Sequence, residues 1–215
     1  MASTTSSRLN LFGVPIDRIG LMQTVERIES WIQRRDCTHL LFTPDTTALM
    51  RARWDDRLKE AYRTADLVTA DGAGLVWASQ VFGASLPERV AGIDLLEAFC
   101  PRAAEKGYRL FLLGAKPGVA EEAAQNLRVR FPSLRIVGTH HGYFDDSTEK
   151  AVLEKIQRSA PDLLLVGMGV PRQEEWILRA QDRLTVPVVM GVGGSFDLLS
   201  GRLTRAPQSW QTLGL

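Results

Sequence analysis

Polar and apolar residues along this chain follow two spacings, one typical of helices and one typical of buried strands. Between residues 24 and 35, apolar residues such as Val25, Ile28 and Ile32 recur at helical spacing. Residues 39–43 then form a short, mostly apolar run that a proline ends, as expected of a strand. The same change of spacing continues down the chain and predicts alternating helices and strands.

The remaining predicted elements extend this pattern to the C-terminal part of the chain. Helices are predicted over residues 46–62, from about 72, and over 94–106, 119–130, 148–159 and 172–184, and strands over 66–70, 108–113, 134–139, 162–166 and 187–192. Asp94 is a predicted helix cap and Gly107 a predicted helix end. Apolar strands that alternate with helices predict an α/β fold, with a mostly parallel sheet covered on both faces.

Length and composition favour one domain and exclude some partners. With 215 residues the chain is long enough for one sizeable core and too short for two. A net charge of +1 gives no support to nucleic acid as a partner. Cys37 and Cys100 lack metal or redox spacing, which fits a cytoplasmic protein. Without a signal-peptide core or a run of about 18 apolar residues, we expect a soluble protein or one that lies on a membrane surface.

Several predicted strands end in the same chemistry, with small residues followed by one or two polar side chains. These strand ends carry Thr43 and Asp45; Asp71, Gly72 and Gly74; Gly114 and Lys116; Gly142 and Tyr143; Gly167, Gly169 and Gln173; and Gly193, Gly194 and Asp197. In a parallel sheet they all lie at one edge, where ligands bind. Glycines there let backbone N–H groups face a phosphate at a helix N-terminus, which favours a phosphorylated or nucleotide ligand.

Asp71 is the first candidate for a catalytic base. It follows a short apolar strand and precedes a turn with Gly72 and Gly74 that opens a helix. This position holds a carboxylate where a substrate can come close to the backbone. Two structural alternatives stay open. Asp71 could cap the following helix, and the turn 114–118, with Lys116, could be an ordinary solvated connection.

Other aromatic and titratable residues favour structural interpretations. Four tryptophans lie on helical stripes and are interpreted as core or interface residues: Trp31, Trp54, Trp77 and Trp176. The adjacent His140 and His141 would point to opposite faces of a strand, so no metal site is predicted. Glu174 and Glu175 are interpreted as the acidic first turn of a helix.

Six short motifs, taken in order, are more specific than any single glycine turn. They are residues 43–45 (TPD), 65–74 (ADLVTADGAG), 89–94 (RVAGID), 142–144 (GYF), 166–174 (VGMGVPRQE) and 191–197 (GVGGSFD). From roughly residue 9 to the end, the chain resembles the WecG/TagA/CpsF glycosyltransferase family. The resemblance implies a Rossmann-like transferase that moves a sugar from a UDP-sugar to a polyprenyl-diphosphate-linked sugar, with inversion and without a metal or other cofactor.

The resemblance also implies which sugars react and which residues act. In the best-known members the donor is UDP-N-acetylmannosamine and the acceptor is undecaprenyl-diphosphate N-acetylglucosamine, an early step toward wall teichoic acid or enterobacterial common antigen. Asp71 matches the general base that takes the proton from the acceptor hydroxyl. Thr43, Arg89 and Gln173 match positions around the same pocket, and the planar fork of Arg89 suits a diphosphate.

The substrate-binding set is assigned to the other strand ends. It consists of Asp45, Gly72, Gly114, Gly142, Tyr143, Gly193, Gly194 and Asp197. Within it, uridine and phosphates are expected along residues 142–143 and 193–197, with Asp197 as a ribose partner. Asp45 departs from the family pattern, because many relatives have asparagine there, and this leaves the identity of the sugar open.

Domain boundaries follow from the extent of the resemblance. Residues 1–8 are expected to be a disordered tail, residues 9–201 the transferase domain, and residues 202–215 the start of a C-terminal appendage. Family members continue into Arg-containing amphipathic helices that are thought to touch the membrane and to stabilise the leaving diphosphate. Without them, slow turnover and an exposed apolar surface that favours a homo-oligomer are expected.

Alternative functions stay open beside a UDP-N-acetylmannosamine transferase at the inner face of the plasma membrane. One is a UDP-hexose transferase of an exopolysaccharide pathway, and another is a catalytically silent nucleotide-binding subunit. A dinucleotide-dependent oxidoreductase is less favoured, because the first strand ends in residues 43–45 (TPD) rather than in a G-x-G-x-x-G turn.

Overall fold

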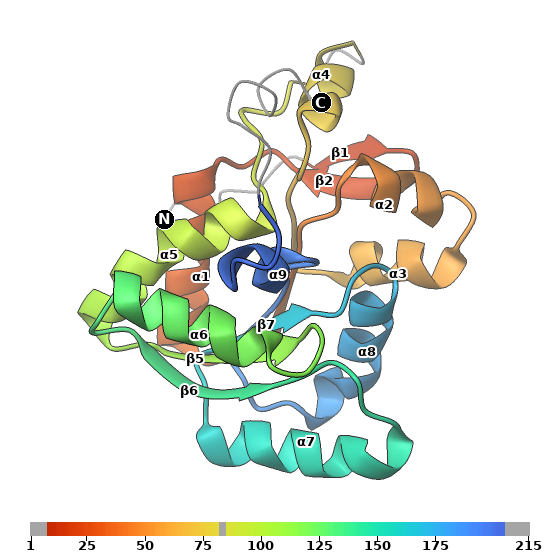
Figure 1. Ribbon diagram of the computed structural model, residues 1–215. Coiled ribbons are helices and arrows are strands. Elements are labelled where there is room, and N and C mark those ends of the chain that lie inside the picture. Colours follow the sequence, from red (N-terminus) through yellow and green to blue (C-terminus); the bar gives the residue numbers. More distant parts are fainter. Residues whose placement is uncertain (1–7, 82–84, 205–215) are drawn as a thin grey trace.

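The computed structural model of the protein describes residues 8–81 and 85–204, and Figure 1 shows its elements. The strands are β1 (Arg8–Leu11), β2 (Val14–Asp17), β3 (His39–Phe42), β4 (Leu67–Val68), β5 (Arg109–Gly114), β6 (Arg135–His140), β7 (Leu163–Gly167) and β8 (Val188–Gly191). The helices are α1 (Leu21–Arg34), α2 (Thr46–Ala52), α3 (Asp56–Thr64), α4 (Ala73–Val81), α5 (Gly92–Lys106), α6 (Val119–Arg130), α7 (Asp146–Ser159), α8 (Arg172–Ala180) and α9 (Ser195–Leu199).

Six of these strands form one parallel sheet in the order β4-β3-β8-β7-β5-β6. Helices cover both of its faces, which confirms the predicted α/β, Rossmann-like fold. In Figure 1, α1, α5 and α6 lie on one side of the sheet and α3 and α8 on the other. The last strand of the chain, β8, pairs with β3 and β7 and so lies inside the sheet.

Alternate residues of each strand supply two separate cores. In β5, Leu110 and Leu112 pack with α1, α5 and α6, whereas Phe111 and Leu113 pack with α3, α7 and α8. Because both faces are buried, the strands read as continuous apolar runs, as expected of a parallel sheet. This double burial fixes the register of the strands and therefore the place of each strand end.

The structure corrects several predicted helix boundaries. The single helix expected over residues 46–62 is two helices, because the Asp55 carboxylate accepts from the Leu58 N–H (3.1 Å) and starts α3 afresh. The predicted cap at Asp94 is wrong: α5 begins at Gly92, with Ala91 as its cap. Gly107 ends α5 in the left-handed conformation, as predicted.

A hairpin of β1 and β2 stands apart from the main sheet and was not predicted. Its strands are antiparallel, and the buried Asp17 carboxylate accepts from the Val68 N–H of β4 (2.8 Å). Arg8, assigned to the tail by the sequence, is the first residue of β1 and donates to the carbonyls of Ala65 and Asp66. The chain therefore joins the domain at Arg8.

The predicted C-terminal boundary falls close to the end of the described part. Arg202 forms an ion pair with Glu122 of α6 (2.7 Å), and the Leu203 N–H donates to the Asp197 carbonyl (3.0 Å). These residues fold back onto the domain. Residues 1–7, which are most of the predicted tail, and residues 205–215 of the predicted appendage lie outside the described residues.

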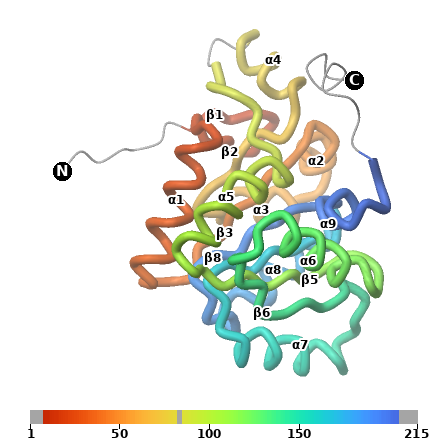
Figure 2. The backbone as a smooth tube through the Cα atoms, turned by 60° about the vertical axis from the view of Figure 1, so that its left-hand side comes forward, coloured from red at the N-terminus to blue at the C-terminus, as the bar shows by residue number. Residues whose placement is uncertain are grey.

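The tryptophans divide into two kinds. Trp31 and Trp176 are buried, as expected. Trp54 and Trp77 are 82% and 68% exposed, so neither is a core residue. Trp77 belongs to α4, which lies at one end of the molecule in both Figures 1 and 2. No helix in the described part of the chain is both long and apolar enough to cross a bilayer.

Replacing Gly114 with alanine is expected to lower the free energy of unfolding by about 2–4 kcal/mol. Gly114 has a φ of +146°, and an added Cβ would lie 2.2 Å from the Gly167 carbonyl oxygen. Urea denaturation measures the loss. Gly194→Ala is the matched control, because its φ is −86° and no atom lies within 4 Å of an added Cβ. Equal losses in both variants would contradict this interpretation.

Candidate active site

The carboxyl ends of the parallel strands place the predicted residues along one edge of the sheet. Two cavities open there. The first, of about 210 Å³, is lined by residues that follow β5, β6, β7 and β8. The second, of about 320 Å³, is lined by residues that follow β3, β4, β7 and β8. Gly193 and Gly194, in the turn that follows β8, line both cavities, so the two cavities are neighbours at the middle of the sheet edge.

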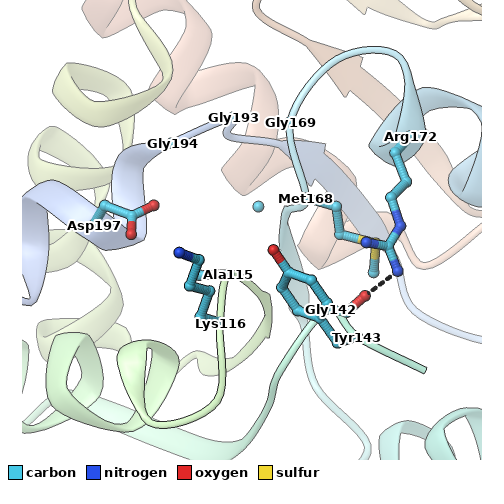
Figure 3. Close-up of a pocket in the computed structure, with 11 residues that line it drawn as sticks. Ala115, Lys116, Gly142, Tyr143, Met168, Gly169, Arg172, Gly193, Gly194 and Asp197 are labelled. Atoms are coloured by element: carbon cyan, nitrogen blue, oxygen red, sulfur yellow. Dashed lines mark hydrogen bonds between the residues drawn. The ribbon is translucent and has the colours of Figure 1, made fainter.

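The first cavity combines open backbone with positive charge. Figure 3 shows Lys116 and Asp197 pointing into it from one side and Tyr143 from the other. No atom lies within 4 Å of a Cβ added to Gly169, Gly193 or Gly194, so a ligand can approach these residues closely.

Arg172 organises the wall of the first cavity beside Tyr143. It donates to the Gly142 carbonyl, and its guanidinium carbon lies 5.3 Å from the centre of the Tyr143 ring. This contact is within the range of a cation–π interaction. Tyr143 is 55% exposed, which leaves much of its side chain available to a planar ligand.

The second cavity has a polar floor and an apolar wall. Thr43, Asp45, Asp71 and Gln173 supply the polar groups. The wall is formed by Ile93, Val170, Val192, Leu198 and Leu203. Such a mixture suits a ligand that carries both hydroxyls and apolar groups.

Asp71 is held at the rim of the sheet by contacts that leave its carboxylate partly open. Its N–H donates to the Pro44 carbonyl (3.0 Å). Its side chain is 29% exposed, and the Gly92 N–H donates to its Oδ2 over 3.4 Å. Burial raises the pKa of Asp71 to about 6, against the effect of the nearby Arg89 cation. In the described part of the chain, the carboxylate accepts no cap hydrogen bond from α4, and it lines the second cavity.

Arg89 lies between two carboxylates. Its Nη1 is 3.5 Å from the Asp71 Oδ1, and its Nη2 pairs with Asp94. Neither cavity is lined by Arg89. In this arrangement the charge of the guanidinium lowers the pKa of Asp71. A direct contact between Arg89 and a diphosphate stays a prediction.

Gln173 connects α8 with the turn after β8. It is 3% exposed, and its Oε1 accepts from the Gly193 N–H at 2.9 Å. Its Nε2 donates to the Glu174 Oε1, also at 2.9 Å. Gln173 thus both lines the second cavity and holds the backbone that borders the first.

Thr43 and Asp45 follow β3. The Thr43 hydroxyl donates to the Gly191 carbonyl (3.2 Å), and Asp45 caps α2 by accepting from the Ala48 N–H (2.7 Å). Both line the second cavity. Asp45 therefore places negative charge near Asp71, and this charge contributes to the raised pKa of Asp71.

Two predicted binding glycines lie outside the lining of both cavities. Gly114 packs against the end of β7, with no room for a side chain. Gly72 accepts from the Leu75 N–H at the start of α4, and a Cβ there would lie 3.4 Å from the Thr46 hydroxyl. The other predicted binding residues, Asp45, Gly142, Tyr143, Gly193, Gly194 and Asp197, line one cavity or both.

Sequence reasoning missed Arg172, Met168 and Glu174. Arg172 and Met168 line the first cavity, and both lie in a motif already singled out, so position within that motif was an available signal. Glu174 is only 1% exposed and is no solvated first-turn charge. It shares the buried face of α8 with Ile177, three positions along.

One group of metal-ligand residue types occurs in the described ranges, far from this site. Asp36, Cys37 and His39 lie before and at the start of β3, and their ligand atoms fall within 4.8 Å of one another. The His39 ring contacts Asp36 (3.0 Å) and Asp66 (3.2 Å). The amino end of β3 is the opposite edge of the sheet from the two cavities.

Comparison with known proteins matches residues 9–215 of the sequence to the family described as "Glycosyl transferase WecG/TagA/CpsF family". The chain belongs to the WecG/TagA/CpsF family. It is therefore a glycosyltransferase, as predicted.

Relatives within the WecG/TagA/CpsF family carry a specific name. The chain is 32% identical, over 213 residues, to the N-acetylglucosaminyldiphosphoundecaprenol N-acetyl-beta-D-mannosaminyltransferase of Staphylococcus aureus strain MRSA252. The match covers 99% of this chain and 83% of the relative. Proteins of the same name from strains NCTC 8325 and COL match equally well.

Asp71→Asn is expected to raise the free energy of unfolding by about 2 kcal/mol at pH 8 and to have little effect near pH 4. Because burial raises the pKa of Asp71 to about 6, the folded state binds its proton more tightly than the unfolded state does. The wild-type protein therefore loses free energy of unfolding as the pH rises from about 4 to 6, and the variant does not. Urea denaturation of both proteins between pH 4 and 8 measures the difference.

Asp145 offers a control with the opposite sign. Hydrogen bonds from Ser147 and Thr148 lower its pKa to about 2, so its ionised form stabilises the folded state and Asp145→Asn should not stabilise the protein at pH 8. An Asp71→Asn variant that is no more stable than wild type at pH 8 would contradict the burial of this carboxylate.

Proposed function

We propose that the protein transfers N-acetylmannosamine from a UDP-sugar to a polyprenyl-diphosphate-linked N-acetylglucosamine, in the synthesis of a cell-surface polysaccharide or teichoic acid. The observation that carries the proposal is a pair of adjacent cavities that share Gly193 and Gly194 in their lining, with a carboxylate of raised pKa in one and cationic side chains in the other. The names of the S. aureus relatives support both sugars and the undecaprenyl diphosphate carrier.

The first cavity is assigned to the donor. Lys116 and Arg172 supply positive charge for a diphosphate, and the open backbone of Gly193 and Gly194 can lie close to it. Tyr143 presents an exposed ring to the uracil, and Asp197 a carboxylate to the ribose hydroxyls. In this assignment the anomeric carbon lies near the border between the two cavities.

The second cavity is assigned to the acceptor, with Asp71 as general base. The Asp71 carboxylate takes the proton of the acceptor hydroxyl as that oxygen attacks the anomeric carbon. The bond from this carbon to the β-phosphate oxygen breaks, and UDP leaves with the electron pair. Attack from the side opposite UDP inverts the anomeric carbon. A pKa of about 6 keeps most of the base ionised at neutral pH while making it more basic than an ordinary aspartate.

We propose that the reaction takes place at the inner face of the plasma membrane, and the lipid-linked acceptor supports a location close to the membrane. The acceptor's diphosphate and lipid would extend from the second cavity toward that surface. A homo-oligomer stays a prediction, which light scattering at micromolar concentration tests.

Product analysis tests the proposed reaction. Incubation with UDP-N-acetylmannosamine and a short-chain polyprenyl-diphosphate N-acetylglucosamine should give a disaccharide product by mass spectrometry and release UDP. A panel of other UDP-sugars serves as the comparison. Preferred transfer of glucose would favour the alternative UDP-hexose transferase, and UDP binding without any transfer would favour a silent nucleotide-binding subunit.

Asp71→Asn is expected to lower turnover by about 10²- to 10⁴-fold, because it removes the base, and to leave the affinity for UDP nearly unchanged. Coupled UDP-release kinetics and calorimetric titration of UDP measure the two effects separately. The aspartate at position 182 in the 3-10 helix Gln181–Arg183 lies outside both cavities, so Asp182→Asn is the control. Comparable turnover by Asp71→Asn and wild type would exclude the assigned base.

Lys116→Met is expected to weaken UDP binding about tenfold, because the ammonium group faces the diphosphate. Uridine lacks phosphate, so its weaker binding should not change. Calorimetric titration of both ligands gives the comparison, with Lys150→Met, an exposed lysine on α7, as the control for overall charge. An equal loss for uridine and UDP would move the phosphates away from Lys116.

A further inference from the structure

Glu174 is a buried carboxylate for which the proposed reaction has no use. It lies in the first turn of α8 and is 1% exposed. Its Oε1 accepts from the Gln173 Nε2 (2.9 Å) and from the Tyr62 hydroxyl (3.4 Å). Its Oε2 is buried and has no hydrogen-bond partner among the described residues. An arrangement of this kind costs stability, so packing alone does not account for it.

The amide of Gln173 carries the effect of Glu174 to the site. A glutamine amide has an accepting oxygen at one position and a donating nitrogen at the other. Because the Gln173 Nε2 donates to Glu174, its Oε1 is turned toward the Gly193 N–H and accepts from it at 2.9 Å. If the Gln173 amide were rotated by 180°, its NH₂ group would face the Gly193 N–H, and two donors would lie against each other. The bond that holds the shared border of the two cavities would then be lost.

We propose that Glu174 is a positioning residue, whose ionised carboxylate fixes the orientation of the Gln173 amide and thereby the Gly193–Gly194 turn for a nucleoside-diphosphate donor. The inference rests on the proposed function, because it takes the first cavity as the donor site. A carboxylate only accepts hydrogen bonds, so the ionised form permits one amide orientation. A protonated carboxyl group also donates, so both orientations become available and the turn is held less firmly.

The charge state of Glu174 changes close to neutral pH. Burial raises its pKa to about 7, and the Glu175 carboxylate acts in the same direction. Hydrogen bonds from Gln173 and from Tyr62 on α3 act against this rise. Burial raises the pKa of the adjacent Tyr62, and Glu174 adds to this rise, as do Asp45 and Asp55 at the starts of α2 and α3. No cation is among the groups that shift the pKa of Glu174 in the described structure. Protonation of Glu174 therefore does not leave a buried positive charge without its partner.

Calorimetric titration of UDP into the full chain between pH 6 and 8.5 tests the proposal. Glu174→Gln keeps the size of the side chain and both accepts and donates at every pH, like the protonated wild type. We expect it to bind UDP about fivefold more weakly than wild type at pH 8.5 and equally well at pH 6. UDP and Asp71 titrate in wild type and in Glu174→Gln alike. The ratio of the UDP affinities of these two proteins therefore reports the titration of Glu174 alone.

Two further variants separate positioning from packing. Glu175→Gln removes the same charge from the neighbouring position and leaves the hydrogen bonds of Glu174 in place. It should bind UDP as tightly as wild type at pH 8.5 and at pH 6. Because Glu175 helps to raise the pKa of Glu174, this variant should only lower the pH at which the affinity changes. Tyr62→Phe removes a donor to the ionised Glu174, so it should move the pH at which the affinity changes upward. It also tests the proposal if Glu174→Gln does not fold.

The outcomes distinguish this inference from the proposed function. UDP binding by wild type together with a Glu174→Gln ratio that does not vary with pH would overturn the positioning role and leave the donor site in place. An unchanged pH midpoint in Tyr62→Phe would overturn it as well. If wild type binds no UDP at any of these pH values, the assignment of the first cavity fails, and this inference fails with it.

Discussion

The site depends on how the turn after β8 is fixed, because Gly193 and Gly194 border both cavities. Three elements hold this short segment. The Thr43 hydroxyl of the β3 end donates to the Gly191 carbonyl, the Val192 N–H donates to Val166 of β7, and the Gly193 N–H donates to Gln173 of α8. Since β8 lies between β3 and β7, the position of this turn follows directly from the order of the strands. A ligand that bridges the two cavities therefore meets a backbone fixed from both sides.

At the same edge of the sheet, Asp71 is a stronger base than an ordinary aspartate, and this lowers the stability of the fold. Burial without a dedicated partner raises its pKa, which costs folding free energy at neutral pH. A full ion pair with Arg89 would remove that cost, but it would also make the carboxylate a weaker base. Arg89 is instead shared with Asp94, and its contact with Asp71 is the longer of the two. The guanidinium thus limits the rise in pKa without cancelling it.

Much of the fold follows from local patterns in the sequence. Helix α6 spans residues 119–130 as predicted, because an apolar stripe begins after a glycine turn and ends at an arginine-rich last turn. The break between α2 and α3 was missed because apolar residues at helical spacing continue across it, while a single capping hydrogen bond of Asp55 decides it. The β1–β2 hairpin was missed because its second strand contains Pro15, and a proline marks a turn or loop more often than a strand.

The sequence predicted that the site residues lie at one edge of the sheet, but it could not predict that they divide between two cavities. Parallel strands place all their carboxyl ends together whatever their order, so Thr43, Asp71 and Gly193 could be grouped from the sequence. Which of them face each other depends on strand order, and that is set by long-range packing. Glu174 could not be recognised for a related reason. A glutamate in the first turn of a helix is ordinarily solvated, and only the packing of α3 over α8 buries this one.

Asp45 illustrates what a departure from the family pattern does in this geometry. Aspartate and asparagine cap a helix about equally well, so the hydrogen bond from the Ala48 N–H does not require the charge. The charge acts elsewhere, because the Asp45 carboxylate contributes to the raised pKa of Asp71 across the second cavity. An asparagine at this position would keep the start of α2 and remove that contribution. The main effect of the aspartate in this chain is therefore to make the Asp71 carboxylate more basic.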